Sequence, residues 1–306
     1  MRTPPGASVP YLVLGPGEVV TSRPGYGPSQ PLVQDLEFID SHFHLEMVLD
    51  NFHFHSFDFL EASIPNHSSF CLLRGVANFV FPPFDVKISK LQGHPRLVYT
   101  VGIHPSAVRQ CLPLSQYVPQ IEHHLVFPTC VGIGELGFDY TKSTPVSLQR
   151  DCLQHLLPLA RCHDKVLVLH ARSDTGGFDT RAVDDLLAML RTFDLLSCRI
   201  HLHCFTYSRL VAEQWMAACP SVCFGFTASV LRGGHLAEVA RSLPIARSLL
   251  ETDSPFLSPP GTAHYKNHPW NILPVAQHIA RLRNMPVADF LTCVNANACN
   301  LYRFPC

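Results

Sequence analysis

The chain has 306 residues, 47% of them hydrophobic, and its 23 Lys and Arg residues against 24 Asp and Glu give a formal net charge of −1. This size and composition provide for a large buried core, which excludes a wholly disordered chain and suits one large α/β domain or two smaller ones. A charge this close to zero excludes broad electrostatic capture of nucleic acid, so any contact with nucleic acid has to be local and made at a site.

Signals for membrane insertion or export are not found in the sequence. No apolar run approaches the ~18–20 residues of a membrane span, and the N-terminus lacks the basic, apolar and small-residue order of a secretory signal. We therefore expect an intracellular protein, cytoplasmic or nuclear and not secreted, with no membrane partner and no obligate protein partner. The twelve cysteines are scattered without a CxxC pair, so we expect reduced core thiols rather than a zinc ribbon or a disulfide framework.

The first segment of the chain, residues 1–35, is rich in Pro, Gly and Ser and has neither helical nor strand periodicity. Such a composition cannot bury enough apolar surface to order itself. We predict a disordered or loosely attached N-terminal arm over 1–35, followed by the main domain over 36–306.

After residue 35 the pattern changes to short, apolar, β-rich runs that alternate with stretches of helical spacing. The runs cover 36–40, 75–81, 96–103, 129–135, 165–170, 198–205, 221–228 and 247–253. Helical spacing is found at 145–164, 181–193 and 209–219, and 286–304 is typical of a closing helix. Eight strands with helix-sized connections predict an α/β fold, a parallel sheet closed as a (β/α)8 TIM barrel. An open doubly wound sheet is the alternative.

The first of these runs leads into FIDSHFHL, residues 38–45, in which two histidines stand two positions apart. Side chains at i and i+2 of a strand share a face, so His42 and His44 can converge on one metal ion. Two ordinary histidines near a strand end are the alternative for this motif alone.

Other strands end in the same kind of residue. The polar residues at the ends of the later predicted strands are His104, Glu135, His170, His203 and Asp253. The C-terminal ends of parallel barrel strands face one shared mouth, where barrel enzymes assemble their sites. Seven isolated polar residues would have to fall at the same end by accident, so the pattern favours a metal site of metallo-dependent hydrolase type.

The donor set indicates what the metal does. Four imidazoles, from His42, His44, His170 and His203, and two carboxylates exceed the three protein ligands of a single catalytic zinc. We predict two divalent ions, Mg, Mn or Zn, that share a bridging carboxylate. Such a pair polarises a phosphoryl oxygen and activates a water for in-line displacement, so hydrolysis of a phosphate ester fits best.

Seven motifs resemble, in order, those of the TatD family of metal-dependent deoxyribonucleases. They are DSHFHL, VGIHP, GELGFDY, LHAR, HCFT, ETDSP and NACNLY, and the resemblance covers nearly everything after residue 35. Within the family, IHLHCFT and FGFTA look most similar to the eukaryotic TatD-domain-containing protein 2 type. The resemblance implies a barrel nuclease that cleaves phosphodiesters, usually in DNA, with exonuclease or endonuclease activity.

The resemblance also implies a role for each predicted ligand. His42 and His44 bind one ion, Glu135 bridges, and His170 and His203 bind the second ion. Asp253 ligates the first ion and accepts a proton from the attacking water, so Asp253 and Glu135 are the catalytic residues that the resemblance implies.

Three further residues near the predicted metal site also have predicted roles. We expect His104 to donate to a phosphate oxygen rather than to be purely structural. The planar fork of Arg172 suits a phosphate, with a surface salt bridge as the ordinary alternative. His201 shares a strand face with His203, and we interpret it as a packed histidine behind the ligand.

The chain departs from the family pattern around the mouth of the barrel. Ser106 stands where family members commonly have a second histidine, and Tyr207 stands where they commonly have glycine. The loop 258–270 is expected to overhang the mouth and to bring Lys266 near a nucleic-acid end.

The substrate expectation is DNA rather than RNA, engaged at strand ends because few phosphates can be neutralised at once. Two other functions stay open: a barrel amidohydrolase or phosphotriesterase acting on a small molecule, and a metal-binding interaction protein without catalysis.

Overall fold

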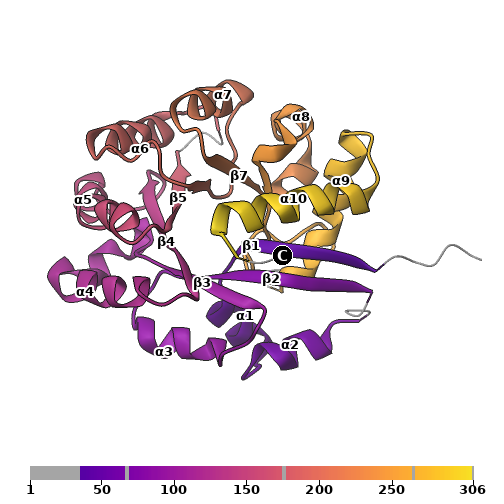
Figure 1. The fold of residues 1–306 in the computed structure, drawn as a ribbon, viewed down its shortest axis with the longest axis horizontal. Helices are drawn as coiled ribbons and strands as arrows, with labels where there is room; N and C mark the ends of the chain where they lie inside the picture. Colours follow the sequence, from indigo (N-terminus) through magenta and orange to yellow (C-terminus); the bar gives the residue numbers. More distant parts are fainter. Residues whose placement is uncertain (1–34, 66–68, 174–176, 264–265, 305–306) are drawn as a thin grey trace, which may run out of the picture. The chain divides into compact units, whose positions relative to one another are not determined.

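The computed structural model describes residues 35–65, 69–173, 177–263 and 266–304. Its strands form one eight-stranded sheet in sequence order, and every neighbouring pair along that order is parallel (Figure 1). The strands are β1 (Leu36–Phe43), β2 (Phe70–Phe79), β3 (Leu97–Val101), β4 (Cys130–Asp139), β5 (Val166–Arg172), β6 (Ile200–Leu202), β7 (Val222–Phe226) and β8 (Ser248–Leu250). The prediction of a TIM barrel is therefore confirmed.

Most helices surround the sheet on its outer side, and the last one extends across the middle of the barrel in this view (Figure 1). The helices are α1 (Leu45–Phe52), α2 (Phe57–Ser63), α3 (Phe84–Ile88), α4 (Leu114–Leu125), α5 (Val146–Cys162), α6 (Arg181–Thr192), α7 (Arg209–Ala218), α8 (His235–Ser242), α9 (Leu273–Leu282) and α10 (Val287–Tyr302). Short 3-10 turns are η1 (Ser89–Leu91), η2 (Pro105–Cys111), η3 (Ala228–Arg232), η4 (Ile245–Arg247) and η5 (Pro269–Ile272). Among the described residues, none of these helices is both long and apolar enough to span a membrane.

The first strand, β1, lies next to the last strand, β8, and this contact nearly closes the barrel. Ser41 Oγ of β1 donates to the Leu250 carbonyl of β8 at 2.9 Å. Beyond β8, the Asp253 amide donates to the His42 carbonyl at 2.9 Å. These bonds bring the last polar motif of the chain next to the first.

The barrel interior changes from apolar to polar along the strands. A buried apolar cluster includes Val76 of β2 and Val98 of β3, together with side chains from the end of α10. Two residues further along the same strands lie Asn78 and Thr100, which are buried and hydrogen-bonded to each other at 2.5 Å. Because residues at i and i+2 share a strand face, the apolar layer supports a polar layer nearer the strand C-termini.

Some boundaries differ from the sequence-based expectations. Strand β4 continues through Asp139, so Glu135 lies within the strand, beside a register shift between Gly134 and Leu136, and not at its end as predicted. The strands β6 and β8 have three residues each, and His203 and Asp253 therefore lie in the segments that follow them.

Two other expectations concern the cysteines and the arm. Among the described residues, ten cysteines are free thiols, as expected, whereas Cys299 is disulfide-bonded. The predicted arm, apart from Asp35, lies outside the described residues, and its disorder stays a prediction.

Candidate metal centre

The six predicted ligands are brought together at the C-terminal end of the barrel, and all are buried. Their elements differ widely in sequence position: β1 and the residue after it, β4, β5, the segment after β6 and the segment after β8. They are His42, His44, Glu135, His170, His203 and Asp253.

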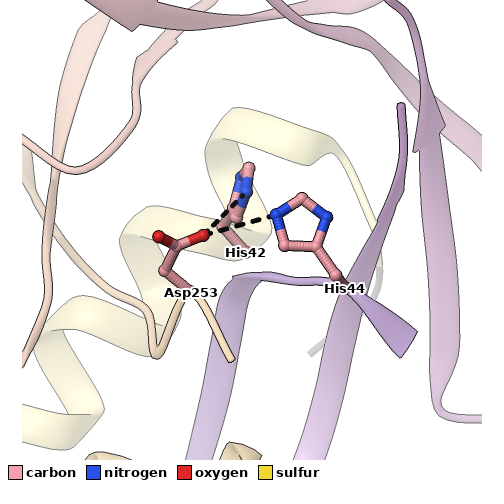
Figure 2. A group of neighbouring side chains, drawn as sticks. All are labelled: His42, His44 and Asp253. Carbon is pink, nitrogen blue, oxygen red and sulfur yellow. Dashed lines mark ion pairs between the residues drawn. The ribbon is translucent and has the colours of Figure 1, made fainter. Parts of the chain in front are cut away.

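Asp253 lies between the two histidines of the first motif. Its Oδ1 is 3.5 Å from His42 Nε2 and 3.4 Å from His44 Nε2 (Figure 2). Two ligand atoms that each bind one tetrahedral ion at 2.0–2.1 Å stand roughly 3.3–3.4 Å apart. The three side chains therefore have the spacing of ligands around one ion.

Glu135 presents its two oxygens to different histidines. Its Oε2 lies 3.4 Å from His42 Nε2. Its Oε1 lies 3.5 Å from His104 Nε2, 2.5 Å from His170 Nδ1 and 3.6 Å from His203 Nε2. One carboxylate thus reaches both halves of the histidine cluster, which is the arrangement that a bridging ligand requires.

Two of the histidine rings, those of His42 and His44, show how a ring nitrogen is presented to the centre. His44 Nδ1 lies 3.2 Å from the Asn78 carbonyl, which only accepts, so Nδ1 donates and Nε2 is the nitrogen that faces the centre. Both ring nitrogens of His42 are buried without a hydrogen-bond partner among the described residues. Burial, together with the nearby His203, lowers the pKa of His42 to about 4, so its ring is neutral at pH 7. A neutral imidazole with unused, buried nitrogens, such as that of His42, fits a divalent metal ion.

Two buried carboxylates behind the ligands were missed by the sequence analysis. Asp139 Oδ2 lies 3.3 Å from His170 Nε2, and its Oδ1 accepts from the Thr141 amide at 2.9 Å. Burial raises the pKa of Asp139, but the hydrogen bond and charge of His170 outweigh it and hold that pKa well below its usual range. Asp139 and Glu251 stand in the motifs GELGFDY and ETDSP, close to a predicted ligand, and that proximity was the available signal.

Glu251 connects the ligand His203 to the closing helix. Its Oε1 lies 3.1 Å from His203 Nδ1 and accepts from the Cys204 amide at 2.5 Å. Its Oε2 lies 2.8 Å from His201 Nε2, and His201 Nδ1 is hydrogen-bonded to Tyr302 Oη of α10 at 2.7 Å. His201 therefore lies behind the ligand, as the sequence analysis interpreted it, and Glu251 directs Nε2 of His203 toward the centre.

Space for the Glu251 carboxylate is provided by Gly225 of β7. A Cβ atom at that position would stand 2.3 Å from Glu251 Oε2 and 2.4 Å from Oε1. No side chain fits at position 225 beside the carboxylate, so the acid in the motif ETDSP requires the glycine in the motif FGF.

His104 is held by the residue that departs from the family pattern. The Ser106 amide donates to His104 Nδ1 at 3.1 Å, which leaves the ring proton on Nε2, 3.5 Å from Glu135 Oε1. Ser106 Oγ lies 2.7 Å from the same nitrogen. Burial lowers the pKa of His104 to about 3, so the ring is a neutral donor at pH 7.

A cavity of about 400 Å³, here called the metal-centre cavity, opens over these residues. Five of the six predicted ligands line it, as do His104 and Arg172. Ser258 of the loop 258–270 lines it, whereas Lys266 of the same loop does not. The ammonium of Lys266 contacts the Asn51 carbonyl and the ring of Phe52 instead. A larger cavity of about 800 Å³ lies at the start of strands β3 and β4 and contains none of the predicted site residues.

An eight-stranded parallel barrel with a buried cluster of histidines and carboxylates at its C-terminal mouth defines the class of barrel metal-dependent hydrolases. Residues 39–303 match the model of the TatD related DNase family. The chain belongs to this family.

Curated relatives agree with that assignment, and a solved structure agrees with the fold. The 3'-5' RNA nuclease TATDN2 of Homo sapiens is 29% identical over 295 residues, which cover 90% of this chain and 36% of the relative. The uncharacterized metal-dependent hydrolase YcfH of Escherichia coli (strain K12) is 29% identical over 268 residues, covering 86% of this chain and 95% of the relative. The crystal structure of YJJV, a TatD homolog from Escherichia coli, has a TM-score of 0.73 at 24% identity and covers 90% of this chain and 100% of that one. The chain thus spans about a third of the human relative and nearly all of the bacterial ones.

Proposed function

We propose that this metal-dependent hydrolase cleaves phosphodiester bonds of nucleic acid with two divalent ions. The observation that carries the proposal is the position of Glu135, whose Oε2 faces His42 while its Oε1 faces His170 and His203. A single ion would leave one of these sets without a role, whereas a bridged pair uses both.

In this proposal His42, His44 and Asp253 hold one ion, His170 and His203 hold the other, and Glu135 bridges. The ions, Mg, Mn or Zn, would polarise the phosphoryl oxygen and lower the pKa of the attacking water. The buried, neutral ring of His42 and the 3.4 Å separation of His44 Nε2 and Asp253 Oδ1 support this ligand set.

The protein's own groups then have three tasks. Asp253 accepts the proton of the attacking water, since its carboxylate lies in the metal-centre cavity. His104 donates its Nε2 proton to a phosphate oxygen, because Ser106 fixes the tautomer that carries it. Arg172 at the end of β5 lines the same cavity and offers a planar pair of donors to a phosphate.

The test of the bridging role is Glu135→Gln, which keeps the side-chain volume and removes the charge. We expect loss of cleavage and of one bound ion, with circular dichroism unchanged because barrel stability comes mainly from the apolar layers. Glu122→Gln is the control, because Glu122 is an exposed residue of α4 whose ion pair with His163 is far from the mouth. Full activity of Glu135→Gln would refute the proposal.

The proposed substrate is a nucleic-acid strand engaged at an end. With a net charge of −1 the chain cannot neutralise a long phosphate track. DNA remains the sequence-based prediction, whereas the human relative is named an RNA nuclease, so both polymers are assayed.

The assay compares linear, end-blocked and closed circular substrates across a salt series. Cleavage confined to free ends with a shallow salt dependence is expected, since each phosphate neutralised in B-DNA adds about 0.9 to the slope of log affinity against log salt. Equal rates on circular and linear forms would contradict engagement of ends.

A further inference from the structure

A second cavity of about 440 Å³ adjoins the metal-centre cavity, and we call it the side cavity. Its described walls come from the segments that follow β4, β5, β6 and β7, represented by Thr141, Ser173, Thr206 and Ser229. Arg172 lines both cavities, so the side cavity begins where the metal-centre cavity ends.

Among the described residues, the side chains that line the side cavity carry positive charge and no negative charge. None of the described residues that line it is acidic, and two of them, Arg172 and Arg232, are arginines. Neither has a carboxylate within ion-pair distance among the described residues, whereas Arg209 and Arg241 on nearby helices are paired with glutamates at 2.7 and 3.5 Å. With respect to the described residues, the two lining arginines therefore have donors that can bind an anion.

Another part of the wall is built by close packing. Gly177 has φ +101°, and a Cβ atom there would stand 2.1 Å from the Thr206 carbonyl and 3.2 Å from His235 Nε2. His235 Nε2 donates to that same carbonyl at 2.9 Å, which fixes the ring at the start of α8. The side cavity is thus shaped by fixed hydrogen bonds and by a glycine that no other residue replaces without strain.

Single-stranded nucleic acid binds where a basic groove follows its backbone. We propose that the side cavity binds the nucleotide next to the scissile phosphate, with Arg232 paired to the adjoining phosphodiester. This inference rests on the proposed function, because it places the scissile phosphate at the metal centre and Arg172 between the two. It makes Arg232 a determinant of strand binding that has no part in the chemical step.

Substrate length separates these two roles. Bis(4-nitrophenyl) phosphate has one diester and no neighbouring phosphate, so it fills the metal-centre cavity alone. A single-stranded hexanucleotide, tested as DNA and as RNA, also reaches Arg232. We expect Arg232→Gln to lower kcat/KM for the hexanucleotide about tenfold, through KM, because a hydrogen-bonded charge pair is lost. The small diester should be cleaved as by the unsubstituted protein.

Arg241→Gln is the matched control, since Arg241 is an exposed arginine of α8 that is paired with Glu238. It should change neither substrate. An equal loss on both substrates in Arg232→Gln, or no loss on the hexanucleotide, would overturn the inference.

Failure of the proposed function itself has a separate signature, because the unsubstituted protein would then cleave neither substrate. In that case the anisotropy of a fluorescent hexanucleotide still decides the inference. Weaker binding by Arg232→Gln than by Arg241→Gln supports the side cavity as a strand-binding site, and equal binding refutes it.

Discussion

Replacement of Glu251 by glutamine is expected to weaken metal binding without removing any predicted ligand. The Glu251 carboxylate is fully buried and faces two ring nitrogens, His203 Nδ1 at 3.1 Å and His201 Nε2 at 2.8 Å. Burial raises the pKa of Glu251, but the two histidines lower it well below its usual range, so the carboxylate is ionised at pH 7. Its two oxygens therefore face one ring nitrogen of each histidine, and the other ring nitrogen of His203, Nε2, faces the centre.

Glutamine has almost the same volume but only one acceptor oxygen. Its amide nitrogen would face a ring N–H of either His203 or His201, so two hydrogen-bond donors would face each other. The tautomer of His203 that suits the amide carries its proton on Nε2, where a metal ion needs the lone pair. Loss of such a partner behind a ligating histidine costs about 10–100-fold in metal affinity, or about 1.4–2.7 kcal/mol.

The assay is competition for Zn²⁺ or Mn²⁺ against a chromogenic chelator, with circular dichroism to confirm folding. Glu213→Gln is the control, because Glu213 is half exposed on α7 and paired with Arg209. Metal affinity of Glu251→Gln within twofold of the control would refute the tautomer argument. A loss much greater than 100-fold would mean that Glu251 does more than orient His203.

Two further substitutions and one truncation test other parts of the structure. Gly225→Ala places a Cβ against the Glu251 carboxylate, and we expect a loss of about 1–3 kcal/mol in the free energy of unfolding, measured with urea. Burial lowers the pKa of His268 to about 4. The unfolded chain therefore binds more protons between pH 6.5 and 4, and stability falls as the pH drops through that window. His268→Asn should lose less stability between pH 7 and pH 5 than the unsubstituted protein does. A chain that begins at Gln34 should fold and cleave, and precipitation or metal loss would refute the domain boundary.

The barrel could be predicted from the sequence because the patterns that indicate it lie within short segments of the chain. Apolar runs that alternate with helical spacing indicate each strand and helix separately, and parallel order follows from the helix-sized connections. The convergence of His42, His170 and Asp253 follows from the same topology, since the C-terminal ends of all parallel strands lie at one mouth of the barrel.

Other features depend on contacts between distant parts of the chain. The partner of His201 Nδ1 is Tyr302, which lies 101 positions away, and no local pattern links them. The place of Glu135 inside β4 results from a register shift against β5. Lys266, expected at the mouth by its place in a loop, contacts α1 instead, because the path of a loop is decided by what its side chains meet.

The closing helix α10 connects two of the strands that position the metal centre. Asn295 accepts from the Ile39 amide of β1 and donates to the Glu37 carbonyl, both at 2.9 Å, while Tyr302 reaches His201 of β6. The strand β1 carries His42, and His203 follows β6, so one helix fixes the spacing of ligands from both. An ion that binds only the folded arrangement stabilises it by mass action. The helix α10 contributes to that stabilisation because it holds the two strands in place. A substitution of Tyr302 that loosens this helix should therefore reduce the gain in melting temperature on adding metal, although Tyr302 contacts no predicted ligand directly.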